Sequence, residues 1–176
     1  MQVFAAELAD LNQCHLINGN FTTDYVWQMQ THTTGPRTDI RFDRVRLPRP
    51  MQVTYPRTTD ELLDHWQQEG CFLVTRSPQD EVAAFLDAQP RRWQDVLWVY
   101  NLVVDRRFRR QGHASALLKA AILWARHEHL HKIMLEMQTK NYPAIALAQK
   151  HGFQFCGFNE RYYTNGDITL YFYLTI

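Results

Sequence analysis

Residues 102–126, with the sequence LVVDRRFRRQGHASALLKAAILWAR, carry the strongest structural signal in the chain. An extended apolar run ends at Val104, an arginine-rich turn follows, and the apolar spacing then predicts a helix from Gly112 to His129. A helix start offers unpaired N–H groups and partial positive charge, and small residues let the backbone approach a ligand closely. The turn is therefore suited to bind a pyrophosphate.

Patterns on either side of this stretch predict a mixed α/β fold around one central twisted sheet, with about six to seven strands and helices on both faces. We expect Pro48 and Pro50 to break the strand in which they lie. The predicted strands are 3–6, 39–55, 71–75, 81–87, 96–104, 133–137, 153–158 and 168–175. The predicted helices are 7–17, 24–31, 59 or 60 to 70, 112–129 and 143–150.

The composition of the chain narrows the classes of function that it can have. A chain of 176 residues fits one domain, and 19 basic against 18 acidic residues give no broad attraction to nucleic acid. Three distant cysteines form no disulfide framework or metal spacing, which favours a reducing compartment. The start of the chain has no signal-peptide pattern, and no apolar run reaches membrane-spanning length, so we expect a cytoplasmic protein. His127, His129 and His131 could suggest a metal site, but cationic groups are also favourable near a helix C-terminus, so no metal is predicted.

Two motifs that follow one another resemble a known family. Arg109, Gly112 and Ala114 form Arg-x-x-Gly-x-Ala between a strand and a helix, and Asn141 follows the next strand. The residues that continue the second motif are Ala144, Leu147, Gly152 and Phe153. Over residues 96–176 this pattern resembles the GNAT N-acetyltransferases, and LEMQTKNYPAIALAQKHGF is most similar to their streptothricin acetyltransferase branch.

The resemblance implies a GNAT fold that binds acetyl coenzyme A and transfers its acetyl group to an amine in a ternary complex. Residues 1–176 would form one N-acetyltransferase domain, with an acceptor-side half at 1–95 and a coenzyme-binding half at 96–176. The acceptor implied is a small polar cation, and dimers are common among similar proteins. The coenzyme-binding residues implied are Leu102, Val103, Val104, Arg109, Arg110, Gln111, Gly112, His113, Ala114, Ser115 and Asn141.

The sequence identifies the catalytic residues less clearly than the coenzyme-binding residues. The family commonly has a tyrosine after the Leu147 position to protonate the leaving thiolate, and here that residue is Ala148. We take Tyr142 as a candidate acid, with Tyr162, Tyr163 and Tyr171 as alternatives. Glu136, with water near Asn101, is the candidate base, because strand alternation turns its side chain away from those of its apolar neighbours.

Alternatives remain open. One interpretation is that an acceptor pocket is lined by Trp27, Asp24 and Trp66. The other is that both tryptophans are core residues and Asp24 caps a helix. The loss of proton-handling groups at Ala148 and Asn101 is compatible with a catalytically silent acyl-coenzyme A sensor. A protein amine is another possible acceptor, longer acyl donors are not separated from acetyl, and a nucleic-acid module is the most distant alternative.

Overall fold

The computed structural model describes residues 1–68 and 70–176. A seven-stranded sheet with the order β1-β4-β5-β6-β7-β9-β8 forms the body, and β6 and β7 are its parallel pair. The strands are β1 (Phe4–Ala5), β4 (Cys71–Arg76), β5 (Val82–Arg91), β6 (Val96–Val104), β7 (Lys132–Gln138), β8 (Gln154–Asn159) and β9 (Thr169–Thr175). The predicted mixed α/β fold with six to seven central strands is confirmed.

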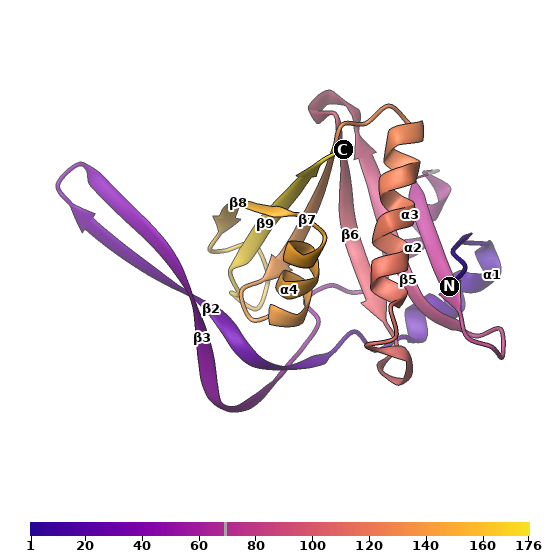
Figure 1. Ribbon diagram of the computed structural model, residues 1–176, viewed down its shortest axis with the longest axis horizontal. Helices are drawn as coiled ribbons and strands as arrows, with labels where there is room; N and C mark the ends of the chain where they lie inside the picture. Colours follow the sequence, from indigo (N-terminus) through magenta and orange to yellow (C-terminus); the bar gives the residue numbers. More distant parts are fainter. Residues whose placement is uncertain (69) are drawn as a thin grey trace.

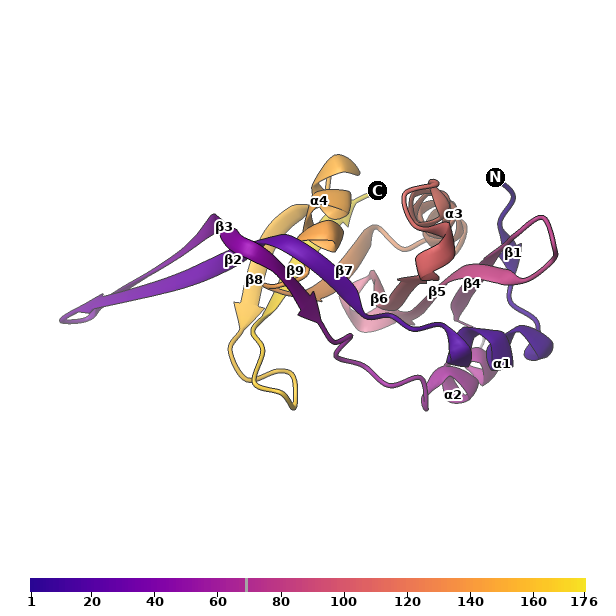
Figure 2. The same ribbon diagram turned by 90° about the horizontal axis from the view of Figure 1, so that it is seen from below.

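Helices cover both faces of this sheet, as Figure 2 shows: α3 and α4 lie on one face, and α1 and α2 lie on the other. The helices are α1 (Leu8–Leu16), α2 (Leu62–Gln67), α3 (His113–His127) and α4 (Tyr142–Lys150), with 3-10 turns η1 (Arg92–Gln94) and η2 (Arg106–Phe108). Alternate β7 residues such as Leu135 and Met137 pack under α3 and α4 in the larger core cluster. Phe72, Val74 and Phe85 pack with α1 in the second cluster.

A second, two-stranded sheet projects from this body (Figure 1). It is the hairpin of β2 (Phe21–Thr34) and β3 (Arg37–Val53). The predicted helix over 24–31 is wrong, because these residues alternate in a strand and pair with β3. Most of the segment 39–55 lies in one strand, β3, whose pairing with β2 is interrupted at Pro48 and Pro50 and resumes at Met51, as the predicted break with a second extended piece implies. Pairing jumps from Tyr25↔Arg46 to Thr23↔Met51, so both prolines lie in an irregular bulge where no ladder N–H is needed.

The remaining element predictions differ from the structure mainly in length. β6 has the predicted bounds, and α1, α3, α4, β7, β8 and β9 begin and end within two residues of them. α2 is shorter than predicted: it begins after Glu61, not after Thr59 or Asp60, and ends at Gln67. The last part of that predicted helix includes residue 69, which lies outside the described residues. None of the helices in residues 1–68 and 70–176 is long and apolar enough to cross a lipid bilayer.

Candidate functional site

The parallel strands β6 and β7 separate at the level of Val99 and Leu135, where their pairing ends. In the same place the β5–β6 register shifts from Ala88↔Val99 to Asp87↔Asn101, so Tyr100 is an extra residue in β6. A β-bulge bends its strand and increases its twist. The bulge therefore accounts for the divergence of β6 from β7 toward their C-terminal ends, which Figure 1 shows.

The backbone of β6 beyond the bulge faces this gap at alternate residues. The Asp105 amide donates to the Ala83 carbonyl of the β5 side at 2.9 Å. Because successive backbone groups of a strand point to opposite sides, Leu102 and Val104 direct their amides and carbonyls away from β5. Arg109 Nε donates to the Val104 carbonyl at 3.0 Å, which agrees with this direction. The gap is thus bordered by backbone groups that have no β-strand partner there.

The turn between β6 and α3 presents free amides beside the gap. Arg110 and Gly112 have φ angles of 64° and 96°, and Gly112 is the N-cap of α3. Within the described parts of the chain, no amide from Gln111 to Ser115 donates to a protein acceptor. A Cβ at Gly112 would meet nothing within 4 Å, so the positive φ, not crowding, is what requires glycine.

The predicted coenzyme residues divide into those with free groups and those with internal partners. Arg110 is exposed and has no ion-pair partner in the described structure. Arg109 instead donates to the carbonyls of Val104 and Asn18, and its burial lowers the pKa of its guanidinium. The His113 ring contacts Thr75 Oγ1 at 2.8 Å, and burial lowers its pKa.

Two further predicted residues lie where α3 and α4 border the gap. Ser115 Oγ lies 2.9 Å from His151 Nε2, and this contact links the first turn of α3 to the end of α4. The Asn141 side-chain oxygen caps α4 by accepting from the Ala144 amide at 3.2 Å. Asn141 Nδ2 therefore remains available as a donor, because the described residues supply no acceptor for it.

Glu136 lies on the sheet face opposite to Leu135 and Met137, as alternation predicts. Its carboxylate accepts two hydrogen bonds from Arg57, one from Trp98 Nε1 at 2.9 Å and one from Tyr162 Oη at 2.9 Å. The Glu136 side chain is only 1% exposed. Four donors fill the four lone-pair positions of a carboxylate, so no position is left to take a proton from an amine. The geometry therefore does not support the predicted role of Glu136 as the base.

Asn101 is fixed by a chain of hydrogen bonds that the sequence did not reveal. Its Nδ2 donates to Asp87 Oδ2 at 2.9 Å, and its Oδ1 accepts from Tyr55 Oη at 3.0 Å. Because Nδ2 donates to Asp87, the oxygen end of the amide faces Tyr55. Asn101 is 4% exposed, and one bond at each end of its amide connects Asp87 to Tyr55.

Asp87 also binds His65, whose Nδ1 lies 2.7 Å from Asp87 Oδ2. This hydrogen bond is the main reason that the pKa of His65 is raised from its ordinary value. Asp87 Oδ1 is buried and has no hydrogen-bond partner in the described structure. An aspartate inside the apolar strand VAAFLDAQ is a sequence signal that could have identified this site, since buried carboxylates are rare without a partner.

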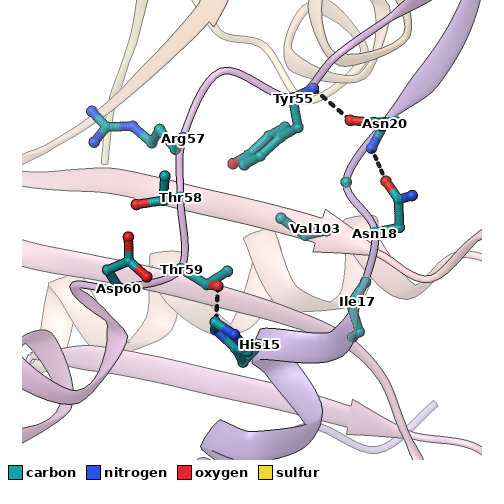
Figure 3. A pocket seen from close by; sticks show the side chains of 11 residues that line it. His15, Ile17, Asn18, Asn20, Tyr55, Arg57, Thr58, Thr59, Asp60 and Val103 are labelled. Atoms are coloured by element: carbon teal, nitrogen blue, oxygen red, sulfur yellow. Dashed lines mark hydrogen bonds between the residues drawn. The ribbon is translucent and has the colours of Figure 1, made fainter.

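A cavity of about 310 Å³ lies beside the C-terminal half of β6. Figure 3 shows its walls, which come from the end of α1 and the segment after it, from the segment before α2 and from Val103 of β6. His15, Tyr55 and Asp60 are titratable residues that line it, whereas the Arg57 guanidinium turns away toward Glu136. Asp60 has no ion-pair partner among the residues that the structure describes. A volume of this size suits a small molecule or the end of a longer one.

The tryptophans predicted as alternative pocket residues do not line this cavity. Trp27 packs against Phe155 and Phe172, with ring centroids 5.9 and 5.7 Å apart. Trp66 lies in the second core cluster and donates to the Ala6 carbonyl at 2.9 Å. Both are partly buried and pack against the core clusters, and Trp66 also lines a separate cavity with Ala6 and Phe72. Asp24 is an exposed residue at the bulge of β2 and caps no helix.

The tyrosines considered for proton donation lie in different surroundings. Tyr142 Oη accepts from Arg44 at 3.1 Å, and its ring packs on Tyr25. Tyr162 donates to Glu136, and burial raises its pKa to about 12. Burial also raises the pKa of Tyr163 and Tyr171. Ala148 is fully buried in the larger core cluster, so no hydroxyl is offered from that position.

Comparison with known proteins decides the family. A profile described as the acetyltransferase (GNAT) family matches residues 42–153, which is more than half of the chain. The chain belongs to the acetyltransferase (GNAT) family. The fold of this GNAT chain is similar to a nourseothricin acetyltransferase structure, with a TM-score of 0.82 and 23% identity over 99% of this chain and 97% of that one. It is also similar to a Bacillus anthracis str. Ames structure in complex with acetyl coenzyme A, provisionally described as a streptothricin acetyltransferase, with a TM-score of 0.76 and 20% identity over 99% of both chains.

Sequence relatives of this GNAT chain match over shorter stretches. Streptothricin acetyltransferase A of Bacillus subtilis strain 168 is 29% identical over 85 residues, which is 46% of this chain and 49% of that protein. An N-alpha-acetyltransferase of Saccharolobus solfataricus is 34% identical over 70 residues, which is 39% of this chain and 42% of that protein. The chain thus spans less than half the length of the curated relatives it matches.

His127, His129 and His131, considered as metal ligands from the sequence, have separate surroundings. His127 Nδ1 lies 3.4 Å from Glu128 Oε1, and His131 Nδ1 lies 2.6 Å from Asp95 Oδ2. Across residues 1–68 and 70–176, no three histidine, cysteine or acidic side chains come together in a way that could hold a metal ion.

Proposed function

We propose that this GNAT chain moves an acetyl group from acetyl coenzyme A to an amine by direct attack in a ternary complex. The observation that carries the proposal is the row of free amides from Gln111 to Ser115 beside the gap between β6 and β7. In this proposal residues 1–95 serve the acceptor and residues 96–176 serve the coenzyme, as assigned from the sequence. The gap and the turn belong to the second half, and most of the cavity wall belongs to the first.

The chain supplies three kinds of group for the coenzyme. The amides at the start of α3 would hold the pyrophosphate, because they combine unpaired N–H groups with the positive end of the helix dipole. Arg110 would add charge. The backbone of Leu102 and Val104 and the free Nδ2 of Asn141 would bind the amide groups of the pantetheine arm. This assignment gives Arg109 a different role from the predicted one: it connects the end of β6 to the cavity rim at Asn18.

The acceptor would bind in the cavity beside β6. Asp60 supplies a negative charge without a competing cation, so a small polar cation fits the site better than an anion. The similarity to streptothricin and nourseothricin acetyltransferases supports the same class of acceptor. The cavity is open to solvent through the exposed residues Thr58 and Asp60, which gives the amine proton a route to water.

Tyr55 is our candidate for the acid that protonates the leaving thiolate. Burial raises the pKa of its hydroxyl, so the phenol keeps its proton at neutral pH. It lies at Asn101, just beyond the bulge where the two strands separate, and it also lines the cavity. Tyr142, predicted from the sequence, remains the alternative, because its Oη accepts from Arg44 and its own proton is uncommitted.

A catalytically silent acyl-coenzyme A sensor is a second candidate function. The observations that favour it are the saturated carboxylate of Glu136 and the buried Ala148, since both remove groups that would handle protons. A protein amine as acceptor is supported by the likeness to the Saccharolobus N-alpha-acetyltransferase.

Release of free coenzyme A thiol from acetyl coenzyme A distinguishes these functions. We expect at least one small cationic amine from a panel that also contains neutral amines and peptide N-termini to raise thiol release by about 100-fold or more, because binding orients the amine toward the thioester. Asp60→Asn should raise the KM for that amine and leave the amine-free rate unchanged. Equal thiol release with every amine and without amine would favour the silent sensor.

A further inference from the structure

Asp87 of β5 is a buried carboxylate that pairs with a histidine of α2. Its side chain is 0% exposed, and the side chain of its partner His65 is 12% exposed, with Nδ1 2.7 Å from Asp87 Oδ2. Among the described residues, His65 is the only ion-pair partner of Asp87. Replacing a buried ion pair by packed apolar side chains is often neutral or stabilising. Stability alone therefore does not explain why a charged pair is buried at this position.

His65 is held in one orientation at the bulge of β6. Its ring packs on Tyr100, the extra residue of the bulge, with ring centroids 4.8 Å apart. Its backbone carbonyl accepts from Gln89 Nε2 at 2.7 Å. Its Nε2 lies 3.9 Å from a carboxylate oxygen of Glu61, whose side chain is 67% exposed. The imidazole is thus fixed between the bulge and the surface, with Nδ1 directed inward to Asp87.

The contacts of Asp87 continue to the hydroxyl of Tyr55. Asp87 Oδ2, the oxygen that contacts His65, also accepts from Asn101 Nδ2 at 2.9 Å, and Asn101 Oδ1 accepts from Tyr55 Oη at 3.0 Å. An amide side chain neither gains nor loses a proton near neutral pH, so these bonds do not carry a proton from His65 to Tyr55. What they fix is the position of the Tyr55 oxygen.

The ring and the backbone of Tyr55 are also fixed. Asn20 Oδ1 accepts from the Tyr55 amide at 2.8 Å, as Figure 3 shows. The backbone of Gly19 lies so close to the ring that a Cβ at Gly19 would come within 2.7 Å of Tyr55 Cγ. Asn101 supplies the contact at the other end of the side chain. In a phenol held at both ends, rotation about the C–O bond moves the proton and leaves the oxygen in place.

We propose that His65 is a positioning residue for acetyl transfer: through Asp87 and Asn101 it fixes the hydroxyl of Tyr55 for protonation of the leaving thiolate. The inference rests on the proposed acetyl transfer and on Tyr55 as its acid. In that step the O–H bond of Tyr55 breaks and an S–H bond forms on coenzyme A. The phenolate then recovers a proton from the solvent that has taken up the proton of the attacking amine.

His65→Leu tests this role through the difference between turnover and affinity. We expect kcat to fall by about 10-fold or more, because the Tyr55 oxygen loses its fixed position, with the Kd of acetyl coenzyme A changed by less than about 2-fold. His65→Asn should keep most of the turnover, since its amide can donate to Asp87 from nearly the place of Nδ1. The matched control is His131→Leu, which removes an exposed pair with Asp95 and should behave as the wild type.

A double-mutant cycle with Tyr55→Phe tests whether His65 acts through Tyr55. In the Tyr55→Phe background, His65→Leu should lower kcat by less than about 2-fold, because no hydroxyl is left to position. Equal factors in the two backgrounds would overturn the proposal, and so would wild-type turnover in His65→Leu. Wild-type turnover in Tyr55→Phe would overturn it too, while leaving the proposed acetyl transfer intact.

Two further measurements cover loss of folding and loss of activity. If circular dichroism shows that His65→Leu does not fold, its combination with Asp87→Leu removes both buried charges and replaces it in each assay. NMR of the protein with ¹³C at the tyrosine Cζ positions needs no turnover: the Tyr55 signal should shift in His65→Leu and stay in place in His131→Leu. An inactive wild type would refute the proposed function, whereas an unmoved Tyr55 signal would overturn the positioning role by itself.

Discussion

Arg57→Ala should lower the free energy of unfolding by about 3–5 kcal/mol, because it leaves the Glu136 carboxylate buried without its cation. The Glu136 side chain is 1% exposed and that of Arg57 is 19% exposed, so solvent does little to compensate for the loss. The pair also connects the segment before α2 to β7, and through Tyr162 to the segment between β8 and β9. Urea unfolding followed by circular dichroism measures the change.

Two further variants separate the buried pair from ordinary surface charge. Arg37→Ala removes an arginine from an exposed pair in which the side chains are 76% and 53% exposed, and it should cost less than about 1 kcal/mol. Combining Arg57→Ala with Glu136→Gln should restore much of the stability, because a neutral amide can still accept from Trp98 and Tyr162. Equal losses for Arg57→Ala and Arg37→Ala would show that Glu136 is not held as the structure indicates.

Tyr55→Phe should lower kcat for acetyl transfer by about 100-fold or more, with little change in acetyl coenzyme A affinity, because it removes only the hydroxyl proposed to protonate the thiolate. The ring that lines the cavity is retained. The matched comparison is Tyr142→Phe, which removes the other candidate hydroxyl. That hydroxyl accepts a hydrogen bond from Arg44. Steady-state thiol release and calorimetric binding together separate turnover from affinity.

The comparison of Tyr55→Phe with Tyr142→Phe identifies the residue that protonates the leaving thiolate. If Tyr142→Phe loses turnover and Tyr55→Phe does not, the residue predicted from the sequence is correct and our structural choice is wrong. A loss of coenzyme affinity in Tyr55→Phe equal to its loss of turnover would instead indicate that the hydroxyl only supports the binding gap.

The C-terminal half of the fold could be predicted because its signals are local. The β6 bounds, the helix after Gly112 and the short helix after Asn141 follow from apolar periodicity and from turn and capping residues close by in the sequence. The hairpin was missed because DYVWQMQT has no turn residue inside it and its pairing partners, from Arg46 for Tyr25 to Ile40 for Thr31, lie beyond a separate turn. The alternation of Trp27 and Met29 with Gln28 and Gln30 was the available signal.

The candidate site was only partly predictable for a different reason. The free amides at the start of α3 follow from a short motif, so residues 111–115 could be named from sequence. The partners of Glu136 and Asn101 could not, because Arg57 and Tyr55 reach them from 79 and 46 residues away in the chain. No pattern in the sequence indicates that a carboxylate near the end of β7 will already be saturated by three neighbours.

Isothermal titration calorimetry of acetyl coenzyme A against three proteins tests the central claim most directly: the wild type, Gly112→Ala and Gly35→Ala. Both glycines have positive φ and open space at the Cβ position, so both alanines strain a turn, but only Gly112 lies among the proposed pyrophosphate amides. We predict binding to the wild type and to Gly35→Ala with the same Kd, and at least about 10-fold weaker binding to Gly112→Ala. Absence of binding to the wild type, or equal Kd values for all three proteins, would contradict the account.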